Sequence, residues 1–396
     1  MKHKTSIKSW RDRSKKVKLI TCFLFIWSVW FTALPTYASD ISLDVGATTD
    51  TVKAGDQDGK SMMKDRRFVP VPIPISNPTL GTGLAAALLY LWPHNEDDTV
   101  SPTSISGVGG LYTNTDSWAA TLFHQGYYAR DRFRLQGVLG YADLNLKFYG
   151  IGNDSIFRDN PLAYGATGTI FNPQARFQLP FISKDLYLGL QLYYLDVEVA
   201  FELSNILPIL PNIAIGQRNV GLGPILSYDS RDNTKWPSTG NYLDLAVLDF
   251  GDYAGGDFDY LQYKLKWSQN FSVTDSLVLQ YRFDGQLIDG RAPFYQLSNI
   301  NLRGIPWGVY ADDMAVTLQG QVRWELFKRW SMLFFGGGGR VAEDVSDLGG
   351  SPTEFAGGTG FRYMIAPKAK LTIGADLAFS NGRAEFYIQL GDFLSN

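Results

Sequence analysis

The fold is decided by Leu277-Val278-Leu279-Gln280-Tyr281-Arg282-Phe283-Asp284-Gly285-Gln286, in which apolar and polar side chains alternate. A second segment, Met314 to Leu326, repeats this alternation, and the long connection between the two contains Asn301-Leu302-Arg303-Gly304-Ile305. Alternation with a period of two excludes a helix and predicts two half-buried strands. One face of each strand should therefore meet an apolar phase, and the other should meet a wet interior that contains charges.

The same period-two pattern runs through most of the chain after residue 80. With the first two segments it gives fifteen clear strands. Within 132–149 the apolar side chains change from odd to even positions, which predicts a one-residue β-bulge. Residues 150–171 and 203–219 are expected to be long loops. The remaining predicted strands span 81–92, 104–112, 117–128, 132–149, 174–181, 186–202, 221–231, 241–250, 258–267, 330–340, 357–365, 371–379 and 385–390.

A proline-rich segment precedes these strands. Residues 68–75 read Phe-Val-Pro-Val-Pro-Ile-Pro-Ile, with proline at every second position. One interpretation is an extended, polyproline-like lead-in. The other is a first strand with a single weakened edge, because alternate residues direct their N–H groups to the same side and proline has none. The sequence leaves both open.

The lengths of the connections indicate the architecture. From residue 150 onward, long connections alternate with short ones, and the connection at 287–313 is the longest. Bacterial outer-membrane barrels have an even number of antiparallel strands, short periplasmic turns and long outside loops. If short and long connections alternate in this way along the whole chain, residues 81–92 are the second strand, so another strand must precede them. The prediction is therefore an all-β, sixteen-stranded antiparallel transmembrane β-barrel, in which the connection containing Arg303 is the sixth extracellular loop.

The N-terminal region predicts export. Residues 1–38 have a basic start, an apolar stretch from Leu19 to Leu34 and the small-x-small site Thr36-Tyr37-Ala38, as in a secretory signal peptide. Residues 39–67 are expected to be a short periplasmic lead, and 68–396 the barrel. The only cysteine, Cys22, leaves with the signal. Removing eight Lys/Arg and one Asp from the totals leaves 28 bases against 38 acids, which argues against nucleic acid as a partner.

Several motifs, in this order along the chain, resemble one family. They are Pro74 to Leu84, Phe148 to Asn153, Tyr228 to Asn233 with Pro237 to Gly240, Leu302-Arg303-Gly304-Ile305, Phe334-Phe335-Gly336 and Gly358 to Tyr363. Together they resemble the bacterial surface antigen superfamily of outer-membrane barrels, which includes BamA-like and TamA-like assembly factors and two-partner secretion translocators. The resemblance extends from Pro74 to the C-terminus. This sequence has Ile305 where the family has an aromatic residue, and Phe393 is followed by three more residues.

The resemblance implies a site inside the barrel. In that family the sixth loop folds into the lumen, and its arginine meets a carboxylate on a late strand. For Arg303 the candidate partners are Asp376 and Glu354. A guanidinium in a partly desolvated lumen needs such a partner. In the strand-turn motif, a lumen cluster or a structural ion-pair network is expected from Asp229, Arg231 and Asp232, followed by the turn residues Pro237 and Gly240.

The resemblance also implies a function. The expected role is transport, translocation or assembly of macromolecules at the bacterial outer membrane, by a barrel-only branch without periplasmic repeat domains. A porin-like diffusion channel and a surface antigen that transports nothing are the alternatives. The bilayer is the expected partner, with other barrel or periplasmic proteins possible. No enzyme activity, cofactor or metal is expected, since His124 has no serine at neighbouring inward positions to act as a nucleophile.

Overall fold

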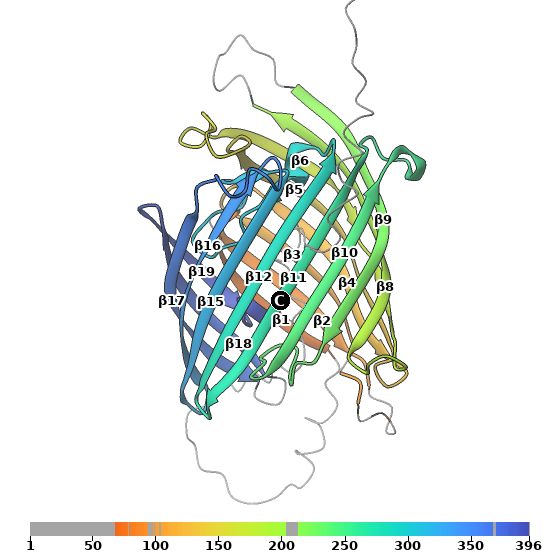
Figure 1. The fold of residues 1–396 in the computed structure, drawn as a ribbon, viewed down its shortest axis with the longest axis vertical. Helices are drawn as coiled ribbons and strands as arrows, with labels where there is room; N and C mark the ends of the chain where they lie inside the picture. Colours follow the sequence, from red (N-terminus) through yellow and green to blue (C-terminus); the bar gives the residue numbers. More distant parts are fainter. Residues whose placement is uncertain are drawn as a thin grey trace, which may run out of the picture.

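The computed structural model describes residues 68–77, 79–93, 98, 100–102, 104–202, 213–366 and 370–395. The predicted signal peptide and lead lie outside these residues. The described chain is almost entirely β-structure, with long tilted strands that run around a common interior (Figure 1). No helix in the described chain is long and apolar enough to cross a bilayer.

Seventeen strands form one antiparallel sheet, and a two-stranded sheet lies in one of the connections. The second sheet consists of β13 (Ser298–Asn299) and β14 (Ala311–Asp312), and three short 3₁₀ helices are η4 (Asp252–Ala254), η5 (Phe294–Gln296) and η7 (Phe393–Ser395). The strands of the large sheet are β1 (Phe68–Asn77), β2 (Gly81–Leu91), β3 (Ile105–Thr113), β4 (Trp118–Tyr128), β5 (Phe133–Phe148), β6 (Leu162–Phe171), β7 (Gln174–Gln178), β8 (Leu186–Phe201), β9 (Ile213–Asp229), β10 (Gly240–Phe250), β11 (Tyr260–Thr274), β12 (Leu277–Gly290), β15 (Met314–Phe327), β16 (Trp330–Ala342), β17 (Glu354–Ala366), β18 (Leu371–Ser380) and β19 (Arg383–Leu390).

The count differs from the expected sixteen because one position in the sheet holds two strands. β6 and β7 each pair with both β5 and β8, so they lie in line between the same neighbours. Asn172 and Pro173 separate them. The prediction of a loop over 150–171 is wrong for its second half, since β6 is rich in Ala, Gly and Thr and shows little alternation. β9 likewise starts at Ile213, well before the predicted 221.

The two faces of the strands have the predicted chemistry. On β12 the side chains of Gln280, Arg282 and Asp284 are buried, whereas Tyr281 is exposed. On β15 the polar residues Thr317, Gln319, Gln321 and Arg323 are buried, and Leu318 and Trp324 are exposed. Because successive side chains of a strand point to opposite faces, the polar set lines the interior and the apolar set the outside.

The predicted β-bulge in 132–149 is absent. β5 keeps an unbroken register with β4 and with β6. Tyr141 is exposed on the outside, whereas Leu144 and Leu146 are buried on the inside and belong to an apolar cluster with the connection that follows β12. The apolar residues change face because the inner wall itself is apolar in this half of the barrel. The change of the apolar residues from odd to even positions therefore shows that the interior is filled with apolar side chains here. The register of β5 with its neighbours does not slip.

The proline-rich segment is a strand. β1 pairs with β2 over all ten of its residues, from Phe68↔Tyr90 to Asn77↔Gly81. A strand residue directs its N–H and C=O to the same edge, and an unbroken ladder needs donors from both strands. Pro70, Pro72 and Pro74 supply none, which places their amide positions on the opposite edge of β1.

That opposite edge faces β19. The hydroxyl of Ser76 donates to the backbone carbonyl of Phe386 at 3.1 Å. Among the described strands, β1 has a registered ladder only with β2, and β19 only with β18. The first and last strands therefore meet at a junction, called the seam below, that lacks the regular pairing found elsewhere in the sheet.

Candidate functional site

The connection between β12 and β15 spans the interior. Near its start, Asn219 Nδ2 on β9 donates to Tyr295 Oη at 2.9 Å, and Gln296 Nε2 donates to Tyr193 Oη on β8 at 2.8 Å. Further along, Ile300, Leu302 and Ile305 are buried in a cluster that includes side chains of β15, β16 and β17. The same connection thus contacts two well-separated parts of the inner wall.

Arg303 belongs to a buried ion-pair group with side chains of β17 and β18, in which Asp376 is the shared carboxylate. Its Nη1 donates to Asp376 Oδ2 at 3.0 Å. Arg362 on β17 contacts both oxygens of the same carboxylate, at 2.5 Å to Oδ1 and 2.9 Å to Oδ2. The three side chains are at most 1 % exposed. Of the two candidate partners, Asp376 is the one that contacts Arg303, whereas Glu354 accepts a hydrogen bond from Asn381.

Other groups fix the remaining surfaces of Arg303. Its Nη2 donates to Gln321 Oε1 on β15 at 2.5 Å. The guanidinium carbon lies 3.6 Å from the centre of the Phe335 ring on β16, and 5.1 Å from that of Phe393. A planar guanidinium can stack on aromatic faces and pair with a carboxylate at once, which an ammonium cannot do in this geometry.

Glycines let the loop reach the wall. An added Cβ at Gly337 or Gly339 of β16 would lie 2.9 Å from Leu302 Cδ2 or 2.6 Å from Ile300 Cγ2. Gly304 has φ +106°, and its Cβ would lie 3.2 Å from Ala356 Cβ. Its N–H donates to Tyr387 Oη on β19 at 2.9 Å. Gly337 and Gly339 therefore leave room on the inner face of β16 for the Leu302 and Ile300 side chains of the loop.

Gly339→Ala is expected to destabilise the folded barrel by about 1–3 kcal/mol, because its new methyl meets Ile300 and Thr317 in a packed interior. Gly336→Ala is the matched control, since its Cβ would make only ordinary contacts, 3.7 Å or more away. The free energy of unfolding of both variants is measured by urea titration in detergent, where the folded barrel is recognised by the change of its electrophoretic mobility on heating. Equal stability of the two variants would contradict this packing.

The C-terminal tail also enters the interior. After β19 the chain turns at Gly391, which has φ +81°. Asp392 is buried and accepts from Gln321 Nε2 at 3.0 Å, and Arg282 Nη1 on β12 donates to the Phe393 carbonyl at 2.8 Å. Phe393 thus lies between Arg282 and Arg303. Sequence reasoning treated Phe393 only as a displaced terminal aromatic residue.

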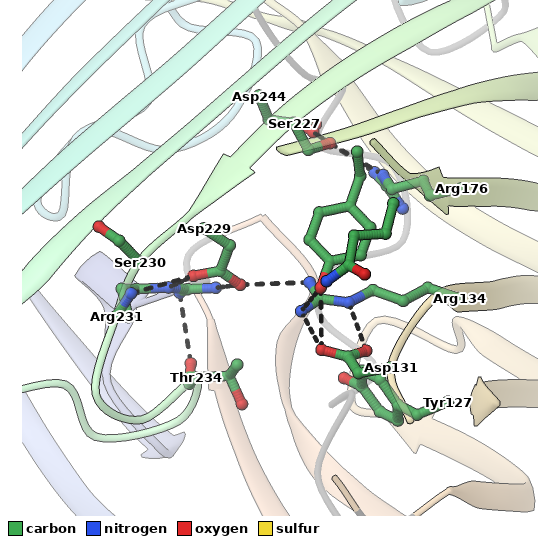
Figure 2. Close-up of polar contacts among 12 residues, drawn as sticks. Tyr127, Asp131, Arg134, Arg176, Ser227, Asp229, Ser230, Arg231, Thr234 and Asp244 are labelled. Atoms are coloured by element: carbon green, nitrogen blue, oxygen red, sulfur yellow. Dashed lines mark hydrogen bonds and ion pairs between the residues drawn. The ribbon is translucent and has the colours of Figure 1, made fainter. Parts of the chain in front are cut away.

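The strand-turn motif forms a separate ion-pair network, shown in Figure 2. Asp229 accepts from Arg231 Nε at 2.8 Å and from Arg134 Nη1 at 3.3 Å, and Arg134 in turn binds Asp131. Beside it, Arg176 contacts Ser227 and Asp244. Asp232 does not join the group, because its carboxylate accepts from the N–H groups of Ser238 and Thr239. The network links β5, β7, β9 and β10 and has a structural character.

The turn after this motif is held against β15. Arg323 on β15 donates to the Pro237 carbonyl at 2.9 Å, and its guanidinium carbon lies 4.1 Å from the Trp236 ring centre. Trp236 is 2 % exposed. Gly240 has φ +97°, and a Cβ there would overlap the Ser230 carbonyl at 2.3 Å. Trp236 and Arg323 were not predicted, although an arginine at an inward position of β15 was a signal that something must pair with it.

His124 has a serine beside it, but on the outward face, because both residues share the parity of exposed apolar side chains, Leu122 on β4 and Val108 on β3. Ser106 Oγ lies 2.8 Å from His124 Nδ1, and Tyr128 Oη lies 2.8 Å from Nε2. The pair lies on neighbouring strands in a chain of aromatic contacts that includes Trp92. β3 is paired on both sides, so its N–H groups are committed to ladders and offer no oxyanion site. In the described part of the chain, no group of three or more His, Cys, Asp or Glu side chains could hold a metal ion.

The sequence of residues 107–300 matches the family model described as the Omp85 superfamily domain. Residues 107–300 form an Omp85 superfamily domain. This confirms the resemblance drawn from the motifs, and with it the placement of the barrel in the bacterial outer membrane. No curated protein matches the sequence.

Solved structures of Omp85 barrels share the fold. BamA of Haemophilus ducreyi lacking POTRA domains 1–3 is 14 % identical, with a TM-score of 0.55 over 83 % of this chain and 70 % of that one. CdiB of Escherichia coli is 11 % identical, with a TM-score of 0.57 over 83 % of this chain and 62 % of that one. CdiB of Acinetobacter baumannii is 11 % identical, with a TM-score of 0.51 over 82 % of this chain and 59 % of that one. The chain spans less than two thirds of the two CdiB chains.

Proposed function

We propose that this Omp85 barrel transports or assembles macromolecules at the outer membrane, and that its working route includes the seam between β1 and β19. One contrast supports the proposal above all. The interior is occupied by a connection fixed through the buried Arg303–Asp376 pair, whereas the two end strands share no registered ladder in the described chain. A passive diffusion channel needs an open interior, which this filled barrel does not have. A barrel that only encloses a channel also has no need for a weakly paired junction between its end strands.

The finer architecture belongs to the same proposal. β6 and β7 fill one position, so the barrel has sixteen strand positions, and the connection at 291–313 is the sixth extracellular loop folded into the lumen. The barrel acts without catalysis, cofactor or metal. Its partners are the lipid bilayer and the macromolecules it handles, with other barrel or periplasmic proteins as further candidates. Nucleic acid is not among them, because the predicted mature chain is acidic.

Locking the seam tests the route. Ser76 and Phe386 lie across the seam, and the Ser76 hydroxyl contacts the Phe386 carbonyl. In a Ser76→Cys/Phe386→Cys variant, oxidation forms a disulfide across the seam. We expect the oxidised variant to fail to complement a strain depleted of the wild-type protein. Complementation is measured as the folded fraction of the strain's outer-membrane barrel proteins and as the amount of macromolecules exposed on its surface. Reductant should restore it. The matched control is Leu84→Cys/Tyr112→Cys, which bridges two strands that are already paired.

The outcomes of the lock separate the candidate functions. Loss of activity only in the oxidised seam variant supports the proposal. Normal complementation with a fully formed disulfide would contradict the seam route. A depletion strain with normal barrel assembly and normal permeability would instead support a surface antigen that transports nothing.

A further inference from the structure

We propose that the outer wall of the barrel carries a binding site for the phosphate group of an anionic phospholipid. The site lies on β3 and β4 and just beyond the end of β2, next to the short turns. It is separate from the seam and from the occupied interior. Its side chains are Trp92, Ser106, His124 and Tyr128, with Arg130 and Arg132 in the turn that follows β4.

Two polar residues interrupt the apolar outer face of this part of the sheet. Ser106 and His124 lie opposite each other on β3 and β4, among outward apolar side chains. Ser106 Oγ lies 2.8 Å from His124 Nδ1 and accepts from Trp92 Nε1 at 2.8 Å. His124 Nε2 lies 2.8 Å from Tyr128 Oη. A polar group that faces lipid costs free energy unless it has a partner, so the four side chains satisfy one another.

A glycine makes room for this chain of hydrogen bonds. Gly126 lies between His124 and Tyr128 on the outward side of β4, and it is buried although it belongs to the outer face. An added Cβ would lie 2.5 Å from both His124 Nε2 and Tyr128 Oη. The Tyr128 side chain therefore folds back over Gly126 to reach His124. Glycine weakens a strand, so its presence here serves the contact between the two side chains.

The direction of the hydrogen bonds leaves one donor at the surface. Trp92 Nε1 only donates, and a neutral imidazole donates through one nitrogen and accepts through the other. When the Ser106 hydroxyl donates to His124 Nδ1, Nε2–H donates to Tyr128 Oη. The Tyr128 hydroxyl then keeps its proton for an acceptor outside the protein, and this side chain is 41 % exposed. The opposite direction would use the tyrosine proton within the chain, so an acceptor bound at Tyr128 selects the first direction.

Aromatic rings place this donor at the edge of the bilayer. A band of outward rings follows the short-turn end of the sheet from β1 to β7, and the ring centres of neighbours are 5.0 and 5.1 Å apart in one half and 5.8 and 4.7 Å apart in the other. The first half consists of Phe68, Tyr90 and Trp92, the second of Tyr128, Phe133 and Phe177, and His124 lies between the halves. Such aromatic girdles lie at the level of the lipid headgroups. The Tyr128 hydroxyl is therefore level with lipid phosphate.

The turn after β4 supplies positive charge. Arg130 and Arg132 are exposed there. Asp131, between them, binds Arg134, and the carboxylate of Asp98 accepts hydrogen bonds from a serine. A phosphate oxygen accepts strong, charge-assisted hydrogen bonds, and guanidinium groups favour an anionic headgroup over a zwitterionic one. Short turns are periplasmic in outer-membrane barrels, so the ligand is an anionic phospholipid of the periplasmic leaflet.

Native mass spectrometry of the protein purified in detergent tests the site. Phosphatidylglycerol is titrated as the probe, and phosphatidylcholine with the same acyl chains is the zwitterionic comparison. We expect the first phosphatidylglycerol to bind with a Kd about fivefold lower than the first phosphatidylcholine, from two exposed charges. Tyr128→Phe should raise the phosphatidylglycerol Kd by about tenfold, as the loss of a hydrogen bond to a charged group does. Tyr112→Phe is the matched control, since this outward tyrosine at the other end of β3 donates to Asp116.

Two further variants separate the parts of the site. Gly126→Ala keeps the tyrosine hydroxyl but displaces it from the imidazole, so it should also raise the Kd. Its control is Gly165→Ala, an outward glycine of β6 with open space around it. Arg130→Gln combined with Arg132→Gln should remove the preference for phosphatidylglycerol and leave the effect of Tyr128→Phe in place. The change of electrophoretic mobility on heating confirms that each variant is folded.

The outcomes separate the phospholipid from other ligands. Weaker binding in Tyr128→Phe and Gly126→Ala, with both controls unchanged, supports the site. An unchanged phosphatidylglycerol Kd in Tyr128→Phe would overturn it, and equal wild-type affinity for the two lipids would overturn the anionic headgroup. Displacement of the lipid by inorganic phosphate would assign the site to soluble phosphate instead. None of these results depends on the seam lock, so the site and the proposed function can fail separately.

Discussion

Asp376→Ala is expected to destabilise the barrel by about 3–5 kcal/mol, the cost of leaving a buried charge without its partner. The carboxylate serves two guanidinium groups, Arg303 and Arg362, which are essentially inaccessible to solvent. Its removal leaves both guanidinium groups buried on the inner wall without the carboxylate that pairs with them. The free energy of unfolding, from urea titration of the heat-modifiable species in detergent, measures the loss.

The geometry also predicts an order among the three members of this group. Arg303→Ala should cost least, because Asp376 keeps both contacts with Arg362. Arg362→Ala should cost more, since Gln389 and the Gly391 carbonyl also lose their donor. Glu354→Ala is the control, because the half-buried Glu354 accepts hydrogen bonds from Asn381 and Tyr310 without a buried ion pair, and loss of such a hydrogen bond costs about 0.5–1.5 kcal/mol. An Asp376→Ala variant as stable as Glu354→Ala would refute the paired-charge interpretation.

The ion pair could be anticipated in part from the sequence. Arg303, beside a glycine in the longest connection, predicted a carboxylate partner, and Asp376 occupied an inward position of a late strand. Arg362 escaped notice even though it lies within the Gly358 to Tyr363 motif. Alternation shows which face a residue takes, but it does not show which inward residues on neighbouring strands are level with one another. That depends on register, which the Gly360↔Asp376 pairing fixes here.

The interior of the barrel was harder to predict than its wall. Period-two alternation identifies strands only while one face is polar and the other apolar. Where the connection between β12 and β15 packs against the wall, inward residues such as Leu144 and Leu146 are apolar too, and the pattern mimics a bulge. In β6, small residues weaken the pattern until a strand resembles a loop. Both errors have one cause, which is that the interior of this barrel is filled with protein.

The same limit applies to the C-terminal tail. Asp392 and Phe393 carry no local pattern that separates a solvated end from a buried one. Their position depends on Arg282, Gln321 and Arg303, which come from two strands and a loop distant in sequence. The tail and the connection between β12 and β15 therefore meet at Arg303. This meeting point determines what removal of either segment should do.

Deleting Asn299 to Val309 is expected to open the interior to ions. The deletion removes the buried apolar side chains of the loop and Arg303, which together fill the space between the walls. A barrel of this size with an empty interior encloses an aqueous channel, as porins of about 16–18 strands do. Single-channel conductance in a planar bilayer should rise from near baseline to a porin-like level. Deleting residues 343–350, an exposed connection between β16 and β17, should leave conductance unchanged.

The tail makes the prediction sharper. Phe393 and the buried Asp392 and Leu394 still occupy the interior after the loop is removed, and Arg282 still binds the tail through the Phe393 carbonyl. Conductance should therefore be lower for the loop deletion alone than for a variant that also lacks the residues after Leu390. Removing only the tail should have a smaller effect, because Tyr295 and Gln296 continue to tie the loop to β9 and β8. A wild-type protein that already conducts like the double deletion would show that the loop does not close the lumen, and would support a diffusion channel instead.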